Sequence, residues 1–234
     1  MTPKALEFIG VVKDYRGLRP LRVQHLAVQA GEIVALDGLD QVAAAVLTDL
    51  ATGTTLPEDG EIRVEGRPTA SVRTPDEWLV FLNRFGIVND RVALLDGLTV
   101  AQNLAMPLTL ELDPLAASER QRVEQVAAAV GLPASDLDRP LPGTSPLATF
   151  RVRLGRAVAL GPRILLIEHP TLGLSAAETG AAAVGIRRVQ SELGPAVLVA
   201  TGDRRLARRV ATRSLVLRPA TGAVEVVHAW RWLR

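Results

Sequence analysis

Short runs of aliphatic residues alternate with longer mixed segments along most of the chain. The most apolar run covers residues 164–167, four consecutive aliphatic residues that follow a Gly-Pro pair. A short apolar run behind turn residues predicts a strand buried on both faces, as in the middle of a parallel sheet. The run ends in Glu168 and continues through His169 into a glycine-containing turn. Because α/β proteins place ligand-binding groups at the carboxyl ends of central strands, this segment is the centre of the candidate site.

The same patterns predict the remaining elements. Runs rich in β-branched residues between turn residues predict strands at 6–12, 25–29, 32–36, 60–66, 196–201, 214–217 and 223–227. Segments with helical character predict helices at 75–82, 118–130, 151–160, 176–193 and 204–210, and in the Ala/Leu-rich stretch that ends at Leu50. Strands and helices alternate with short connections in the second half of the chain. This order indicates an α/β fold with a mainly parallel sheet flanked by helices.

Cap residues define two of these helices further. Thr74 followed by Pro75 predicts an N-cap and a proline in the first helical turn. Ser118 is expected to cap the helix at 118–130, and Gly131 is expected to end it. Residues 99–148 are largely helical and are punctuated by prolines, so we interpret them as an insertion into the α/β domain.

Composition excludes several classes of function. The chain of 234 residues has no cysteine, so it has neither disulfides nor a thiolate metal site, and a cytoplasmic location is expected. No long uncharged apolar stretch predicts a transmembrane span, and the first residues lack the apolar core of a signal peptide. The net charge of +2 favours neither nucleic acid nor acidic lipid as a partner. The only lysines are Lys4 and Lys13, so a site that needs a lysine later in the chain is excluded.

Six segments carry a resemblance to a known family. In chain order they are Tyr15, Ala-Gly-Glu-Ile-Val-Ala-Leu at 30–36, Gly-Glu-Ile-Arg-Val-Glu-Gly at 60–66, Leu-Thr-Val-Ala-Gln-Asn at 98–103, Arg-Val-Arg-Leu-Gly-Arg-Ala at 151–157, and the strand and turn at 164–175. These are similar to the A-loop aromatic, A-G-E-h-h-A-L, G-E-I-x-h-x-G, L-T-V-x-E-N, R-V-x-x-A-R-A and the Walker B strand with its D-loop in ATP-binding-cassette (ABC) nucleotide-binding domains. Each match alone is weak, but six in the right order and spacing strongly indicate the fold.

The resemblance implies the arrangement of the domain. It predicts a P-loop NTPase-like core with a mainly parallel sheet, an N-terminal antiparallel β subdomain and an inserted helical subdomain. Residues 1–234 would form one nucleotide-binding domain. Residues 1–90 and 149–234 would form the core with the β subdomain, and 91–148 the helical subdomain.

The residues that carry phosphate chemistry in this family differ in this chain. The Walker A pattern G-x-x-x-x-G-K-[ST] holds phosphates with loop amides and a lysine, and Mg²⁺ with a hydroxyl. Aligned from Gly38, the chain has Gln41 in the loop, Ala43 at the second glycine, Ala44 at the lysine and Ala45 at the hydroxyl. Two carboxylates, at positions 37 and 40, add negative charge where phosphate would lie. We therefore expect phosphate binding to be lost.

The other motif positions are degenerate as well. The family's Q-loop glutamine falls on Asp90, its Walker B aspartate on Glu168, its catalytic glutamate on His169 and its switch histidine on Gly202. The signature L-S-G-G-Q falls on residues 144–148, where Ser145 is kept and Pro146, Leu147 and Ala148 replace the glycines and glutamine. No metal site and no intact catalytic residue are expected.

Each of these residues has a functional and a structural interpretation. Glu168 could hold Mg²⁺ through water or simply end a strand, and His169 could act as a substitute general base or be a tolerated replacement. Tyr15 could stack on adenine or pack on the β subdomain. Ser145 could contact a γ-phosphate, but Pro146 lacks the amide hydrogen of the family's glycine. The structural interpretation is favoured for all four.

The resulting prediction is a subunit of an ABC transporter with a degenerate nucleotide site. It would hydrolyse ATP poorly or not at all, bind no cofactor, and lie in the cytoplasm on the inner face of the membrane, docked on a permease. It would pair with itself or with another cassette. The sequence at 98–108 resembles that of small bacterial export cassettes. Two alternatives remain: a working ATPase that binds MgATP with altered residues, or a soluble scaffold or regulatory protein outside transport.

Overall fold

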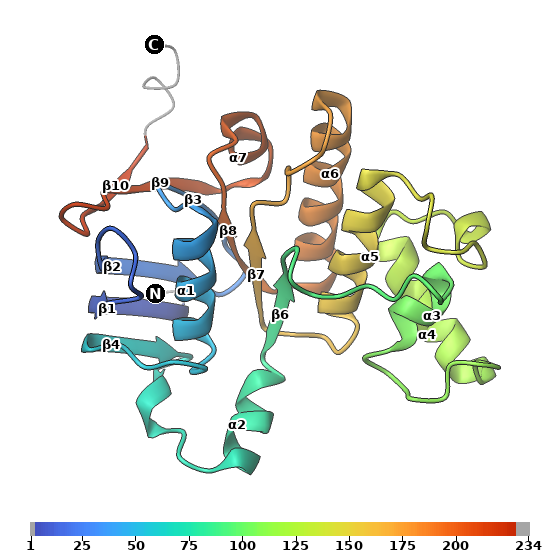
Figure 1. Cartoon of the computed structure of the whole chain (residues 1–234), viewed down its shortest axis with the longest axis horizontal. Helices are drawn as coiled ribbons and strands as arrows, with labels where there is room; N and C mark the ends of the chain where they lie inside the picture. The colour runs from blue at the N-terminus through green and yellow to red at the C-terminus, as the bar shows by residue number, and fades with distance from the viewer. Residues whose placement is uncertain (1–2, 228–234) are drawn as a thin grey trace.

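The computed structural model describes residues 3–227, which form two β-sheets with helices between and around them (Figure 1). A four-stranded sheet has the order β2-β1-β4-β5, and a six-stranded sheet has the order β10-β9-β3-β8-β7-β6. The predicted α/β class, with an N-terminal antiparallel part and a mainly parallel sheet, is confirmed. Within residues 3–227, none of the helices combines the length and apolar character that crossing a membrane requires.

The smaller sheet is antiparallel and comes from the first third of the chain. It contains β1 (Lys4–Lys13), β2 (Leu21–Gln29), β4 (Asp59–Val64) and the short β5 (Arg67–Pro68), which is followed by the 3₁₀ turn η1 (Thr69–Ser71). Phe8, Leu26 and Ile62 are paired across its strands and are almost fully buried. This buried face packs towards α1 (Gln41–Ala51), which lies between the two sheets (Figure 1).

The larger sheet provides the edge on which the candidate site lies. Its parallel strands are β3 (Ile33–Asp37), β6 (Phe85–Val88), β7 (Ile164–Glu168), β8 (Ala196–Ala200) and β9 (Arg213–Leu217), and β10 (Val224–Val226) runs antiparallel at one end. All five residues of β7 and of β8 are buried. Because β3, β6, β7 and β8 are parallel, their carboxyl ends lie along one edge of the sheet.

Successive side chains of the larger sheet belong to two hydrophobic cores, as the two-residue period of a strand requires. One core, on the α1 side, takes the set Val34, Leu36, Ile164, Leu166, Leu198 and Ala200. The other core takes Ile33, Leu165, Ile167, Val197 and Val199 and packs against α5 (Pro146–Val158), α6 (Ala176–Leu193) and α7 (Arg204–Val210). A strand with apolar residues on both faces explains the uninterrupted aliphatic runs in the sequence.

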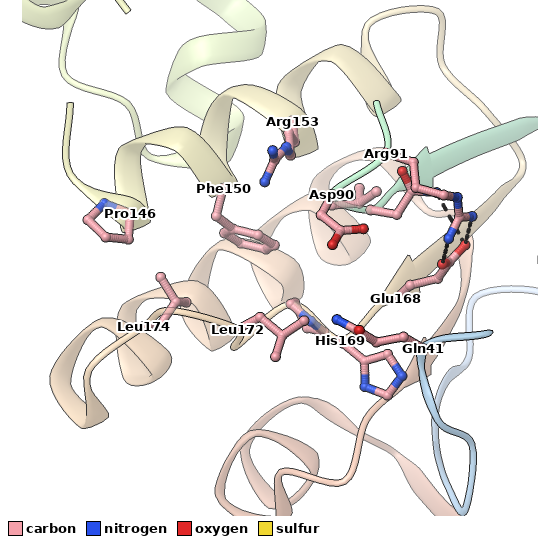
Figure 2. Close-up of a pocket in the computed structure, with 13 residues that line it drawn as sticks. Gln41, Asp90, Arg91, Pro146, Phe150, Arg153, Glu168, His169, Leu172 and Leu174 are labelled. Carbon is pink, nitrogen blue, oxygen red and sulfur yellow. Dashed lines mark hydrogen bonds and ion pairs between the residues drawn. The ribbon is translucent and has the colours of Figure 1, made fainter. Parts of the chain in front are cut away.

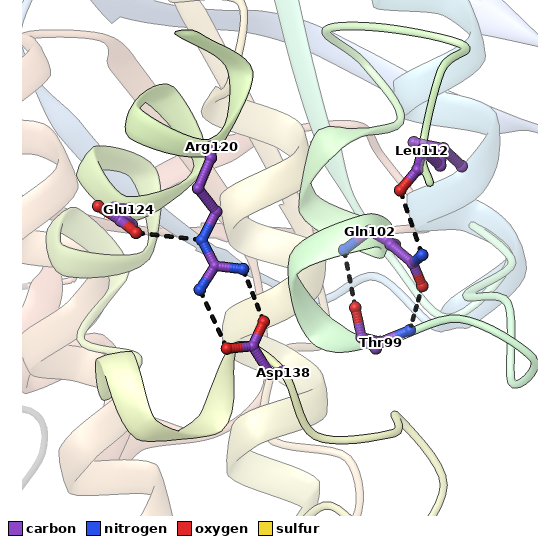
Figure 3. A network of polar contacts seen from close by, with 6 residues as sticks. All are labelled: Thr99, Gln102, Leu112, Arg120, Glu124 and Asp138. Atoms are coloured by element: carbon purple, nitrogen blue, oxygen red, sulfur yellow. Dashed lines mark hydrogen bonds and ion pairs between the residues drawn. The ribbon is translucent and has the colours of Figure 1, made fainter. Parts of the chain in front are cut away.

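The helical lobe consists of α3 (Val100–Ala105), α4 (Ala117–Val130), η2 (Ala134–Asp136) and α5 (Pro146–Val158). A capping box between Thr99 and Gln102 begins α3, and the Gln102 amide also donates to the carbonyl of Leu112 at 3.1 Å (Figure 3). Arg120 of α4 donates to both carboxylate oxygens of Asp138, at 2.6 and 3.1 Å. These contacts fasten the loops of the lobe to its helices.

The helix ends test the cap predictions. Thr74 caps α2 (Pro75–Leu82) by accepting from the Glu77 amide, and Gly131 ends α4 in the left-handed conformation, as predicted. Ser118 does not cap α4, which was a wrong prediction, because the helix begins one residue earlier, after Ala116, and the serine hydroxyl donates to the neighbouring Glu119.

The start of α5 was also placed incorrectly. The sequence predicted a helix from 151, but α5 begins at Pro146 behind the N-cap Ser145. The predicted boundary between core and helical subdomain, at 148/149, therefore falls inside a helix that contacts α3 and α4 as well as α6 and β6.

Candidate functional site

The segment aligned with Walker A is a tight turn followed at once by a helix. Gly38 has a φ of 95°, and a Cβ there would lie 2.1 Å from the carbonyl oxygen of Leu217, so only glycine fits. Asp40 then caps α1, and its Oδ1 accepts a hydrogen bond of 2.7 Å from the Ala43 amide. The chain's own carboxylate thus holds an amide at the helix N-terminus, where an anionic ligand would otherwise bind.

The position aligned with the phosphate-binding lysine points into the core. The helix α1 begins at Gln41, three residues before Ala44, so residues of the expected loop are wound into the helix. Ala44 is 0% exposed and belongs to the core between the two sheets. Ala45, at the position of the Mg²⁺-binding hydroxyl, is partly buried and offers no oxygen. The segment therefore differs from the family's Walker A motif in its backbone conformation as well as in its side chains.

At the end of β7, Glu168 is bound by an arginine that the sequence analysis did not single out. Arg91 donates to the two carboxylate oxygens of Glu168, at 2.7 and 2.9 Å, and the Asn89 amide donates to Oε1 at 3.2 Å (Figure 2). The Glu168 side chain is only 6% exposed, whereas that of Arg91 is 47% exposed. The hydrogen bonds to Glu168 raise the pKa of the Arg91 guanidinium, and the carboxylate is neutralised within the chain.

His169 and Gly202 occupy the positions of the catalytic glutamate and the switch histidine. His169 has a φ of 42°, its amide donates to the carbonyl of Ala200 at 2.8 Å, and Figure 2 shows its ring beside Gln41. Gly202 follows β8, and a Cβ there would lie 3.6 Å from Asp37 Oδ1. Both residues therefore stand at the carboxyl edge of the larger sheet, as the alignment with the motifs predicts.

The signature residues are used to begin α5. The Ser145 hydroxyl accepts a hydrogen bond of 3.2 Å from the Ala148 amide, and Pro146 is in the first turn. Leu147 is partly buried against the second core. The structural interpretation of Ser145, in which its hydroxyl is engaged within the chain, agrees with this geometry.

Tyr15 lies near the start of α1. Burial raises the pKa of its hydroxyl, and the negative charge of Asp40 raises the pKa further, which places the two residues within electrostatic range. The ring packs against the first core, and a Cβ on Gly17 would lie only 2.6 Å from a ring carbon. Tyr15 is thus fixed by packing.

One hollow brings several of the predicted site residues together. It lies between α5 and the ends of β6 and β7, and its empty volume of about 580 Å³ includes the open solvent at its mouth. Predicted residues in its lining are Gln41, Asp90, Pro146, Glu168 and His169. Tyr15, Ala44 and Gly202 do not line it. Arg91, Phe150 and Arg153 also line it, although they were not predicted as site residues. Arg91 directly follows Asp90 and Arg153 lies in the matched segment 151–157, and these were the available sequence signals.

MgATP is the ligand that this arrangement of motifs implies, and the side chains present do not fit it. A phosphate cradle needs unengaged loop amides and a lysine, but Asp40 binds the amide of Ala43 and position 44 is a buried alanine. A Mg²⁺ ion needs oxygen ligands, but position 45 is alanine and the carboxylate of Glu168 is bound by Arg91.

Comparison with known proteins identifies the family. A family model described as "ABC transporter" matches residues 21–172, which run from β2 through the helical lobe to the turn after β7. The chain belongs to the ABC transporter family. This confirms the resemblance that the order of the motifs indicated, while the degenerate state of the nucleotide site remains a prediction.

Two curated relatives of this cassette are import ATP-binding proteins. It is 32% identical over 219 residues to the methionine import ATP-binding protein MetN of Nocardia farcinica, covering 91% of this chain and 64% of the relative. It is 32% identical over 194 residues to the sulfate/thiosulfate import ATP-binding protein CysA 2 of Chromobacterium violaceum, covering 82% and 50%. The chain therefore spans about half to two thirds of these relatives' length. Their direction of transport is opposite to that of the export cassettes suggested by the residues around 98–108.

Solved structures agree on the fold of the cassette. A dimeric structure of MJ0796, a bacterial ABC transporter cassette, superposes with a TM-score of 0.77 at 21% identity, covering 96% of this chain and 99% of that one. The structure of cbiO1 from Clostridium perfringens, described as part of the complex cbiONQ, superposes with a TM-score of 0.80 at 20% identity, covering 97% and 88%.

Proposed function

We propose that this cassette is a subunit of an ABC transporter whose own nucleotide site neither binds nor hydrolyses MgATP. The observation that carries the proposal is the pairing of Glu168 with Arg91, because a guanidinium occupies the carboxylate at the end of β7. The capping of α1 by Asp40 supports it independently at the phosphate end of the site.

The contacts within the chain favour the site without nucleotide over the site with MgATP bound. Hydrogen bonds to charged groups contribute about 1.5–3 kcal/mol each, and Mg²⁺ would have to displace those between Arg91 and Glu168. Phosphate would also meet the carboxylate of Asp40 at the helix N-terminus. No lysine follows Lys13 in the sequence, so no other part of this chain can supply the missing ammonium group.

Binding to a membrane permease is a role that a cassette can keep when it has the family's fold but lacks the family's nucleotide-binding residues. In this proposal the cassette binds a membrane permease through its helical lobe, near residues 90–115, on the cytoplasmic face of the membrane. It pairs with a second copy or with another cassette, and in a mixed pair the other cassette supplies any hydrolysis. The import ATP-binding relatives and the dimeric MJ0796 cassette support this assembly by analogy.

An assay of ATP hydrolysis tests the proposal. The purified chain is expected to show no MgATP hydrolysis above background, and the His169→Glu variant is expected to remain inactive, because Arg91 still binds Glu168 and phosphate is still unheld. A turnover of about 1 s⁻¹ or more that is abolished in the His169→Ala variant would instead support an ATPase with altered residues.

A further inference from the structure

The hollow beside β7 has two different walls. One wall is the face of α5 formed by Pro146, Phe150 and Arg153, which are spaced to lie along one side of a helix. The opposite wall is formed by the turn after β7, where Leu172 and Leu174 lie. Figure 2 shows Phe150 and Leu172 on either side of the hollow, with Arg153 and Asp90 towards its upper edge. The lining therefore combines an apolar surface with charged groups on one side.

Two polar atoms in this lining have no partner within residues 3–227. They are Nε of Arg153 and Nε2 of His169, both buried from solvent. A buried polar atom without a hydrogen bond costs about 1–3 kcal/mol. Both side chains belong to the wall of the hollow, so polar groups that the fold itself leaves unsatisfied are gathered there.

The charges of the lining indicate the kind of ligand. Arg91 and Glu168 neutralise each other, so the charged groups outside that pair are Arg153 and Asp90, which have opposite signs. A simple anion would meet the carboxylate of Asp90, and a simple cation would meet the guanidinium of Arg153. A ligand that carries both charges complements both groups.

We infer that this hollow binds a small zwitterion with an apolar side chain, of the α-amino acid type. Its carboxylate would accept from Arg153, its ammonium would donate to Asp90, and its side chain would pack between Phe150 and Leu172. Such a ligand has no phosphate and does not use the degenerate Walker A segment. Its binding is therefore independent of the nucleotide prediction, and it would bridge α5 to the end of the larger sheet.

Isothermal titration calorimetry of the full chain with L-phenylalanine tests the inference. We expect a dissociation constant of about 1 mM or tighter, in line with the usual free energy per atom of small ligands. Two matched analogues separate the charges: 3-phenylpropionate lacks the ammonium group and 2-phenylethylamine lacks the carboxylate. Each is expected to bind at least about tenfold more weakly, because one charged group of the site is left unpaired.

Variants assign the charges to residues. Arg153→Gln and Asp90→Asn are each expected to weaken binding of phenylalanine about tenfold or more. Arg151→Gln is the matched control: Arg151 is on the same helix and also has a buried, unpartnered Nε, but it lies over Gly131 and away from the hollow, so binding should be unchanged. Melting curves of each variant establish that it is folded.

Three results would overturn the inference. The first is the absence of any heat of binding for phenylalanine at concentrations well above the expected dissociation constant. The second is equal affinity for phenylalanine and 3-phenylpropionate together with no effect of Asp90→Asn, which would assign the hollow to a simple anion. The third is loss of binding in Arg151→Gln as large as in Arg153→Gln, which would place the ligand elsewhere on α5.

Discussion

Replacing Ala44 with lysine, the residue of the family pattern, is expected to lower the free energy of unfolding by about 3–5 kcal/mol and to restore no nucleotide binding. Ala44 is fully buried among apolar side chains on the inner face of α1. A lysine there overfills the core and takes an ammonium group out of water without a partner. Chemical denaturation of the variant and the parent chain measures the loss.

The matched control for this change lies on the same helix. Val42 is 58% exposed, so Val42→Lys adds the same charge to α1 in water and is expected to change the free energy of unfolding by less than about 0.5 kcal/mol. If Ala44→Lys were as harmless as Val42→Lys and also bound MgATP, position 44 would face a nucleotide site. The structure of the Walker A segment described above would then be wrong.

Removal of Arg91 is expected to be the second most damaging change. Arg91→Gln leaves the almost fully buried carboxylate of Glu168 without its cation and should lower the free energy of unfolding by about 2–3 kcal/mol. The guanidinium is partly exposed, so the loss should be at the lower end of the range for buried pairs. For a domain of this size, the melting midpoint would fall by about 4–12 °C.

A double-mutant cycle separates the pair from its surroundings. In Arg91→Gln/Glu168→Gln neither charge remains, so the double variant should be more stable than the sum of the two single losses predicts, by about 1 kcal/mol or more. Arg163→Gln is the control, because its ion pair with Glu65 involves a side chain that is 74% exposed and should contribute less than about 1 kcal/mol. If the loss in free energy of unfolding of the double variant equalled the sum of the two single losses, Arg91 and Glu168 would not stabilise the fold as a pair.

Elements whose ends are fixed by local chemistry could be predicted from the sequence. The helix α6 was predicted at its observed bounds, and the structure shows local chemistry at both ends: Ser175 and Glu178 form a capping box, and Gly194 ends the helix in the left-handed conformation. The strand β7 was recognised from its uninterrupted aliphatic run. Where two residues compete for the same role, as Ala116 and Ser118 do at the start of α4, the sequence pattern selected the wrong one.

The candidate site was predictable only in part, because its contacts are not local. The positions of Glu168, His169 and Asp90 followed from motif spacing, and the structure brings all three to one hollow. The arginine that binds Glu168 lies 77 residues earlier in the chain, at a position with no role in the motifs. Helix α1 begins earlier than the Walker A spacing predicts because Asp40 caps it, and the motif spacing alone gives no sign of this cap.

The melting temperature of the isolated chain in excess MgATP tests the central claim most directly. A ligand at about 100 times its dissociation constant adds roughly 2.7 kcal/mol of stability, so a nucleotide-competent cassette of this size should melt roughly 5–11 °C higher. Because Asp40 caps α1, Ala44 is buried and Arg91 binds Glu168, we predict no measurable rise with MgATP or MgADP. A rise of several degrees that is abolished by Tyr15→Ala would contradict the account, since adenine stacking would then support a working nucleotide site.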